Sequence, residues 1–315
     1  MRLRVEAYAV NTCLKMFNVL NHFKTWKSSK VKKVIPNIAV ISATDGNHEK
    51  FVPWVAQIFG CKCVILIHEK VSTTRENALK VYGAQMIRAR KNYDESEKLT
   101  QEKARNNIWC VISDTSYEGY TEFPKYVMKI YEVNTYEAVI QQNVKPAHVF
   151  LQTKAGNLAA GVTVNLFRNL DYAPRIILAE PENTDCWVQS IKHQKPVVCE
   201  GSLDTYRAGI ACGTVSWVAW NILNKTIKTS INISDLYAAK AMRCLKFCKE
   251  SEYPIEAAAS ATASLASPII SVNTPALNQK LKIDNKAQIL IIDSEGNTDP
   301  DRYTKIISNE LLSET

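Results

Sequence analysis

Four loops of the sequence concentrate polar side chains that could bind or transform a small molecule. Each follows a short apolar run and leads into a helix-like segment; the loops are 43–48 (ATDGNH), 113–120 (SDTSYEGY), 153–161 (TKAGNLAAG) and 293–299 (DSEGNTD). In open parallel α/β sheets, ligands bind in loops of this kind, at the carboxyl ends of the strands. A cleft built from these loops would therefore be a small-molecule site.

The spacing of histidines and cysteines does not indicate a metal site. The chain has five histidines and nine cysteines, but no CxxC pair. Cys61 and Cys63, like Cys244 and Cys248, lack zinc-type partners, and nothing supports a metal role for His48. We expect most of these cysteines to be thiols in the core.

The segments around the loops alternate between strand-like and helix-like patterns. Apolar runs predict strands at 38–42, 63–67, 84–88, 109–112, 148–152, 175–179 and 287–292. Helix-like stretches include 48–59, 73–82, 94–106, 121–142, 157–169 and 184–194. Continuous apolar strands suit burial on both faces, so this alternation predicts an α/β protein with parallel sheets flanked by helices.

The length and the position of one proline predict two domains. A chain of 315 residues allows about two domains. Pro146 follows a long helix-like segment and precedes a new strand, which makes it the expected boundary. The region 216–286 is mostly helix-like, and its Ala-rich part, 256–266, is typical of a buried helix.

Composition and charge exclude several classes of protein. With 46% hydrophobic and 22% charged residues, the chain is typical of a globular protein rather than a disordered or fibrous one. No apolar run approaches the roughly 18 residues of a membrane span. The net charge is +8, but residues 1–36 hold eight basic side chains and one acidic (+7), so the remainder is nearly neutral. We therefore expect neither nucleic acid nor membrane as a partner.

The basic leader leaves two interpretations of location. In the first, the leader is a solvent-exposed helix and linker. The protein is then expected in the cytoplasm, because the sequence shows no secretory signal. The alternative is a mitochondrial targeting segment, since the leader is basic, poor in acids and partly amphipathic.

Four stretches in order carry a family resemblance. They are ATDGNH (43–48), DTSYEGYTEFP (114–124), AGIACG (208–213) and SEGNTD (294–299). The set resembles the diaminopropionate ammonia-lyase family, within the fold-type II pyridoxal-phosphate (tryptophan synthase beta-like) enzymes. The resemblance implies two lobes, each with a mostly parallel sheet: a larger cofactor-cradling domain of 1–36 and 147–315, and a smaller α/β domain of 37–146. It also implies a homodimer.

The resemblance assigns roles to five residues. Lys15 would attach pyridoxal 5'-phosphate covalently, and Asn47 would donate to the cofactor's phenolic oxygen. Asp45 and Asp114 would move the substrate's α-proton, and acids on opposite sides of the cofactor would serve both enantiomers. Ser294 would lie near the pyridine nitrogen. The plainer alternatives are an exposed helix lysine at Lys15, a helix cap at Asn47 and loop caps at the two aspartates.

The phosphate loop departs from the family pattern, which resembles GVGxxAGG. Here Lys154 takes the first glycine position, Gly156 and Gly161 remain, and Asn157 follows Gly156; the resemblance implies that these residues bind the cofactor. Lys154 would either place a cation beside the phosphate or fill the space that the phosphate needs. A second family loop, Ser-Gly-Glu-Ser-Gly, becomes Ala257-Ala258-Ala259-Ser260-Ala261. The whole chain has only 10 glycines. It also starts a few residues before Lys15, so we expect the family's N-terminal segment to be missing.

These residues predict one activity and leave others open. The resemblance implies a pyridoxal-phosphate-dependent lyase that takes a small amino acid, 2,3-diaminopropionate, to pyruvate and ammonia. The alternatives are a catalytically degenerate relative with a binding or regulatory role, and another β-eliminating enzyme of the same fold. Cys186 and Cys212 both fall in matched stretches, and a bridge between them is a further hypothesis.

Overall fold

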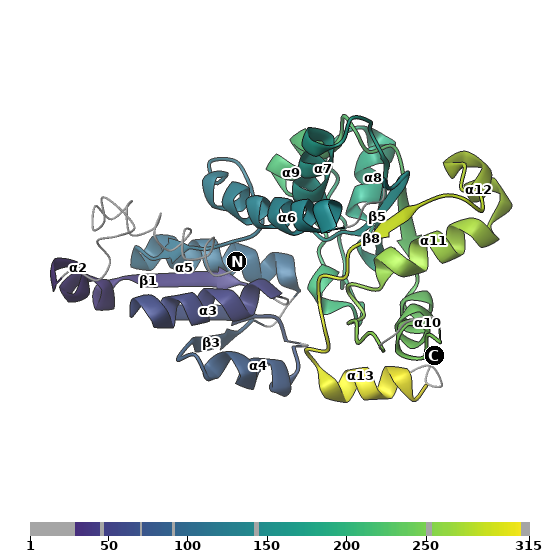
Figure 1. The fold of residues 1–315 in the computed structure, drawn as a ribbon. Helices are drawn as coiled ribbons and strands as arrows, with labels where there is room; N and C mark the ends of the chain where they lie inside the picture. The colour runs from purple at the N-terminus through teal and green to yellow at the C-terminus, as the bar shows by residue number, and fades with distance from the viewer. Residues whose placement is uncertain are drawn as a thin grey trace. The chain divides into compact units, whose positions relative to one another are not determined.

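The chain divides into two compact units. The computed structural model describes residues 29–44, 47–69, 71–89, 92–141, 145–249 and 254–309. One unit ends at Ile130 and the other begins at Tyr131. Each is built around its own sheet (Figure 1).

The first unit contains a four-stranded parallel sheet in the order β3-β2-β1-β4. The strands are β1 (Ala39–Ala43), β2 (Lys62–Ile67), β3 (Gln85–Arg88) and β4 (Cys110–Val111). All of β1 is buried, as is β2 after its first residue, because helices cover both faces. Burial on both faces is therefore confirmed for β1 and β2, whereas β3, at the edge of the sheet, is half-buried to exposed.

Helices of the first unit pack on opposite faces of its sheet. The helical segments are α2 (Ser29–Val34), η2 (Ile35–Asn37), α3 (Asn47–Phe59), α4 (Thr73–Lys80), α5 (Tyr93–Asn107) and α6 (Glu122–Gln141), which crosses the division between the units. Val52 and Ala56 of α3 share a core cluster with Val40 of β1, whereas Ala104 of α5 packs with Ile41 on the other face. Helix α5 starts beside the loop after β4, because its first residue, Tyr93, donates from Oη to Asp114 Oδ1 at 3.1 Å.

The second unit repeats the arrangement, with four parallel strands in the order β7-β6-β5-β8. They are β5 (His148–Gln152), β6 (Arg175–Pro181), β7 (Ser230–Ile233) and β8 (Ile289–Ile291). Its helical segments are α7 (Asn157–Asn169), η3 (Glu182–Thr184), α8 (Cys186–His193), η4 (Ala208–Ile210), α9 (Trp217–Leu223), α10 (Asp235–Lys246), α11 (Ala263–Asn273), α12 (Pro275–Leu281) and α13 (Pro300–Ile307). Helices α10 and α11 share a core cluster with β5, β6 and β7.

The α/β class and the two parallel sheets agree with the sequence prediction, with two local differences. Strand β7 was expected to be helix-like, but it extends the sheet beside β6. The expected helix over 256–266 starts only at Ala263, because Ala257 bridges to Gly296 and Ala258 N–H donates to the Glu295 carbonyl. The division at 37–146 remains a prediction. No helix within the described ranges is long and apolar enough to cross a membrane.

Candidate active site

Three of the expected site residues cannot be placed. Lys15 and Asp45 lie outside the described residues. Asn47 begins α3, but its side chain is outside the description as well. In the first unit the candidate residues lie in the loop after β4, and in the second unit they lie in the loops after β5 and β8.

The loop after β4 holds Asp114 among hydroxyl groups. Tyr93 Oη donates to Asp114 Oδ1 at 3.1 Å, and Thr115 Oγ1 lies 3.4 Å from the same oxygen. The Thr115 N–H donates to Ser113 Oγ at 3.0 Å. Because these contacts come from both the loop and α5, the orientation of the Asp114 carboxylate depends on residues distant in sequence.

A partly buried tyrosine and a buried histidine fasten the start of this loop. Tyr120 Oη accepts the Ser113 N–H and donates to the Val111 carbonyl, both at 3.0 Å. Burial raises the pKa of Tyr120 well above its ordinary value, so the phenol stays protonated as a donor. His48 Nε2 lies 3.1 Å from the Ile112 carbonyl oxygen. The first turn of α3 is thus tied to the end of β4.

The loop after β5 is shaped by a tryptophan. Gly156 has φ +105°, and a Cβ there would lie 2.2 Å from the Trp187 ring. The Trp187 indole N–H donates to the Lys154 carbonyl at 3.1 Å, and the Ser216 N–H donates to the Ala155 carbonyl at 2.8 Å. Glycine is therefore required at this turn, both for its backbone angle and for space.

The first turn of α7 carries an unsatisfied polar side chain. The first N–H groups of a helix have no intrahelical acceptor, which favours anions at this end. Asn157 is 7% exposed, and neither its amide oxygen nor its amide nitrogen has a hydrogen-bond partner among the described residues. Burial of an unpaired amide is costly, so a ligand with donor and acceptor atoms fits this position.

Ser294 and Gln152 join the ends of β8 and β5. The Gln152 amide donates to Ser294 Oγ at 2.7 Å and to the Ile292 carbonyl at 3.0 Å. The hydrogen bond from Gln152 orients the hydroxyl of Ser294. Such a neutral hydroxyl suits the position expected beside a pyridine nitrogen.

Three of the loops singled out in the sequence converge in the second unit. The Gly209 N–H donates to Ser260 Oγ at 3.2 Å, and a Cβ on Gly209 would lie 3.1 Å from a Glu295 carboxylate oxygen. Residues 208–213, 257–261 and 294–299 are therefore neighbours. Family glycines are replaced by alanines at 257–261, yet Gly209 is kept where the approach is closest.

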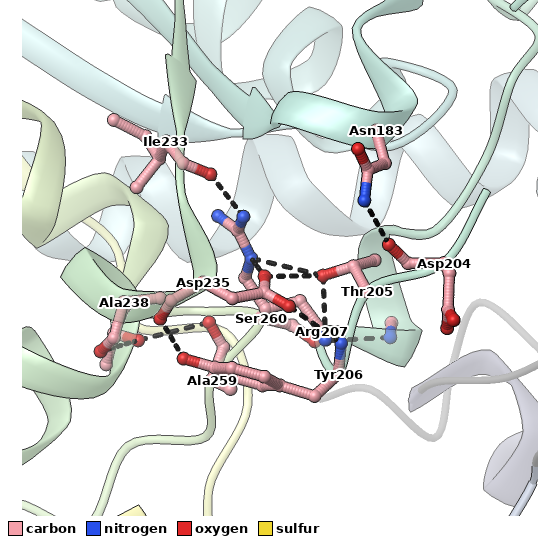
Figure 2. A network of polar contacts seen from close by, with 12 residues as sticks. Asn183, Asp204, Thr205, Tyr206, Arg207, Ile233, Asp235, Ala238, Ala259 and Ser260 are labelled. Carbon is pink, nitrogen blue, oxygen red and sulfur yellow. Dashed lines mark hydrogen bonds and ion pairs between the residues drawn. The ribbon is translucent and has the colours of Figure 1, made fainter. Parts of the chain in front are cut away.

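A polar network anchors the loop that precedes Gly209 (Figure 2). Arg207 is 1% exposed, and its Nε donates to Asp235 Oδ1 at 2.8 Å, while its Nη2 donates to the Ile233 carbonyl. Thr205 Oγ1 donates to Asp235 Oδ1 at 2.7 Å, and the Tyr206 N–H donates to Asp235 Oδ2 at 3.1 Å. Asp235 thus ties the loop to the start of α10, a role that the sequence analysis missed.

Glu180 positions Trp187, a role that the sequence pattern did not indicate either. Glu180 is 1% exposed and accepts the N–H groups of Trp187 at 3.0 Å and Val188 at 2.6 Å, and the hydroxyl of Ser230 at 3.1 Å. Burial raises the pKa of Glu180 to about 8, although these hydrogen bonds oppose the rise. The only sequence signal was an acid at the end of an apolar strand.

The cysteine hypothesis is wrong in this structure. Cys186 and Cys212 are free thiols. Cys186 Sγ donates to the Cys212 carbonyl at 3.6 Å, and Cys212 Sγ donates to the Thr214 carbonyl at 3.2 Å. Each thiol is therefore directed to a backbone oxygen. Within the described part of the chain, no group of three His, Cys, Asp or Glu side chains could hold a metal ion.

Comparisons with known proteins agree on one family. The family model described as "Pyridoxal-phosphate dependent enzyme" matches residues 14–295. Diaminopropionate ammonia-lyase of Salmonella typhimurium is 29% identical over 298 residues, which cover 91% of this chain and 74% of the relative. The enzyme of the same name from Escherichia coli (strain K12) is 33% identical over 275 residues, 84% of this chain and 69% of the relative.

Solved structures agree with these relatives. Escherichia coli diaminopropionate ammonia lyase, crystallised with an aminoacrylate-PLP azomethine reaction intermediate, matches with a TM-score of 0.83 at 29% identity. The match covers 97% of this chain and 78% of that chain.

Proposed function

The chain belongs to the family of pyridoxal-phosphate dependent enzymes, and on this premise we propose that it is a carbon–nitrogen lyase acting on 2,3-diaminopropionate. The observation that carries the proposal is the similarity to diaminopropionate ammonia-lyases over most of both chains. The reaction removes the α-proton and the β-amino group as ammonia. The aminoacrylate that remains is hydrolysed to pyruvate and a second ammonia.

The second unit has residues that fit the cofactor. The first turn of α7, with the buried and unpaired amide of Asn157, suits a phosphate, and Gly161 follows one turn later on the same face. Lys154 adds a cation to this loop. Ser294 would face the pyridine nitrogen. Bound pyridoxal phosphate supplies an electron sink for the electrons left on the α-carbon.

The remaining roles are proposals carried by the resemblance. Lys15 attaches the cofactor, and Asn47 donates to its phenolic oxygen. Asp45 and Asp114 each accept the α-proton, from one enantiomer apiece. The hydroxyls of Tyr93 and Thr115 beside Asp114 support a carboxylate role, because they stabilise its ionised form.

Assembly and location are also proposals. We expect a homodimer in the cytoplasm, with mitochondria as the alternative because of the basic leader. Light scattering of the purified protein tests the dimer, and imaging of a tagged full-length chain tests the location.

The lysine assignment is tested with the full chain and added pyridoxal phosphate. Pyruvate should form from diaminopropionate, and borohydride should fix the cofactor to a peptide containing Lys15. Lys15→Ala should lower pyruvate release to background, because no other group would provide the attachment. The exposed Lys286→Ala serves as the control. A Lys15→Ala variant that still binds covalently contradicts the lysine assignment, and a wild-type protein that releases no pyruvate contradicts the activity.

A further inference from the structure

Tyr93 is the first residue of α5 and lies beside Asp114. We propose that Tyr93 is a positioning residue, which holds the Asp114 carboxylate in the orientation needed to accept the substrate's α-proton. The inference rests on the proposed lyase function and adds a determinant of which enantiomer is processed.

The phenol is placed by a rigid element. Asn92 caps α5, because its side chain accepts the Glu95 N–H at 3.1 Å. Tyr93 is 2% exposed, so its ring has little rotational freedom. Its hydroxyl lies 3.1 Å from Asp114 Oδ1 and 3.5 Å from Thr115 Oγ1. A helix start therefore presents a fixed donor to the carboxylate.

The carboxylate itself lies on a loop, outside any helix or strand. Strand β4 is only two residues long, and Asp114 comes three residues after it. Asp114 is half-buried, whereas Tyr93 and Thr115 are buried. The hydroxyl contacts from α5 and from the loop both fall on Oδ1. Fixing one oxygen of a carboxylate fixes its plane, which a proton transfer over hydrogen-bond distance requires.

Other titratable groups surround this loop and stay unchanged in the test. Glu97 lies one turn after Tyr93 on α5 and raises the pKa of Tyr117 and Tyr120, in addition to the larger effect of burial. Arg105, also on α5, lowers the pKa of Tyr117. Replacing the Tyr93 phenol with a phenyl ring alters none of these groups and removes only one hydroxyl.

The two enantiomers of diaminopropionate provide an internal control. If Asp45 and Asp114 each accept the α-proton of one enantiomer, loss of the Tyr93 hydroxyl affects only the reaction that uses Asp114. A general defect in folding or cofactor binding affects both reactions equally. The ratio of the two rates therefore separates positioning from a structural role.

The experiment compares Tyr93→Phe with the wild type as holoenzyme, with pyruvate release measured from D- and L-diaminopropionate across pH. We expect kcat to fall about 10- to 100-fold for one enantiomer, the effect of losing one hydrogen bond to a charged group, with KM nearly unchanged. For that enantiomer, the acidic limb of the profile of kcat against pH should move to higher pH, because the Tyr93 hydroxyl that stabilises the ionised Asp114 carboxylate is gone. Asp114→Asn should abolish the same reaction.

The matched control is Tyr82→Phe, which removes a hydroxyl before β3, at the sheet edge opposite β4. It should leave both rates unchanged. Should Tyr93→Phe fail to fold, Thr115→Val provides the same test, with a smaller loss of kcat that is again confined to one enantiomer. Equal losses for both enantiomers, or no loss, overturn the inference. A wild-type holoenzyme inactive on both enantiomers overturns the proposed function, and this inference with it.

Discussion

The loop after β4 in the first unit and the loop after β5 in the second unit satisfy their polar groups in different ways. Around Asp114, the hydroxyls of Tyr93 and Thr115 contact each other and the carboxylate. Around Gly156, backbone carbonyls are bound by Trp187 and Ser216, while the Asn157 amide has no partner among the described residues. The difference fits the roles proposed above, a reacting carboxylate in the first loop and a bound ligand at the second.

Substitution of one glycine in each loop by alanine compares how tightly the two loops are packed. Gly156→Ala places a methyl 2.2 Å from the Trp187 ring at a φ of +105°, whereas Gly119→Ala meets nothing within 4 Å at a φ of +79°. We expect Gly156→Ala to lower the free energy of unfolding by about 3–5 kcal/mol and Gly119→Ala by about 1–2 kcal/mol, the cost of backbone strain alone. Urea denaturation of both variants measures the difference, and equal losses would show that Trp187 does not confine the loop.

Glu180 extends the comparison, because two backbone N–H groups and one hydroxyl donate to its carboxylate, whereas the contacts described for Asp114 come from hydroxyls. Its pKa is raised from 4.5 in a solvated chain to about 8 in the fold, so the folded state retains a proton that the unfolded state has lost. Its contribution to stability is therefore full below about pH 4.5 and declines as the pH rises towards about 8.

Glu180→Gln keeps the shape and removes this titration. We expect the free energy of unfolding of the wild type, relative to the variant, to fall between pH 5 and pH 8 by about 1–3 kcal/mol. Thermal unfolding across that range measures the relative change. Glu182→Gln, on the exposed start of η3, is the control. A parallel pH dependence in wild type and Glu180→Gln would contradict the raised pKa.

The smallest effect concerns the unpaired amide. Asn157→Ala should weaken binding of pyridoxal phosphate about tenfold, the worth of one hydrogen bond to a charged group. It should not lower the stability of the cofactor-free protein, because the amide is buried there without a partner among the described residues. Pyridoxal, which lacks the phosphate, should bind both proteins alike. Titrations followed by absorbance measure the two affinities, with Asn169→Ala at the far end of α7 as the control. Equal weakening for both compounds would place Asn157 away from the phosphate.

Much of the fold could be predicted because strands that are buried on both faces have unbroken apolar sequences. Strands β1, β5 and most of β6 are buried along their length. Strand β7 was missed, since its four residues alternate between half-buried and buried positions and follow no such run. The start of α11 was placed too early because the Ala-rich segment before it is held by Gly296 and Glu295, far along the chain.

The site could be predicted only where its signal is local. The polar loops and Gly156 are visible as strings of residues, and the structure brings 208–213, 257–261 and 294–299 together. Tyr93 and Trp187 could not be found, because their roles come from contacts with residues 21 and 33 positions away. An aromatic residue at a helix start is otherwise read as core.

The strand order of the second unit has a consequence for biosynthesis. Strand β5 pairs with β8, so one edge of β5 stays open until residue 291 has been made. The first unit has all its strands by residue 111 and can fold while the rest of the chain is still on the ribosome. The hydrogen bond between Gln152 and Ser294 therefore forms late, after most of the chain has been synthesised. Truncation before β8 would leave an exposed sheet edge that is prone to aggregation.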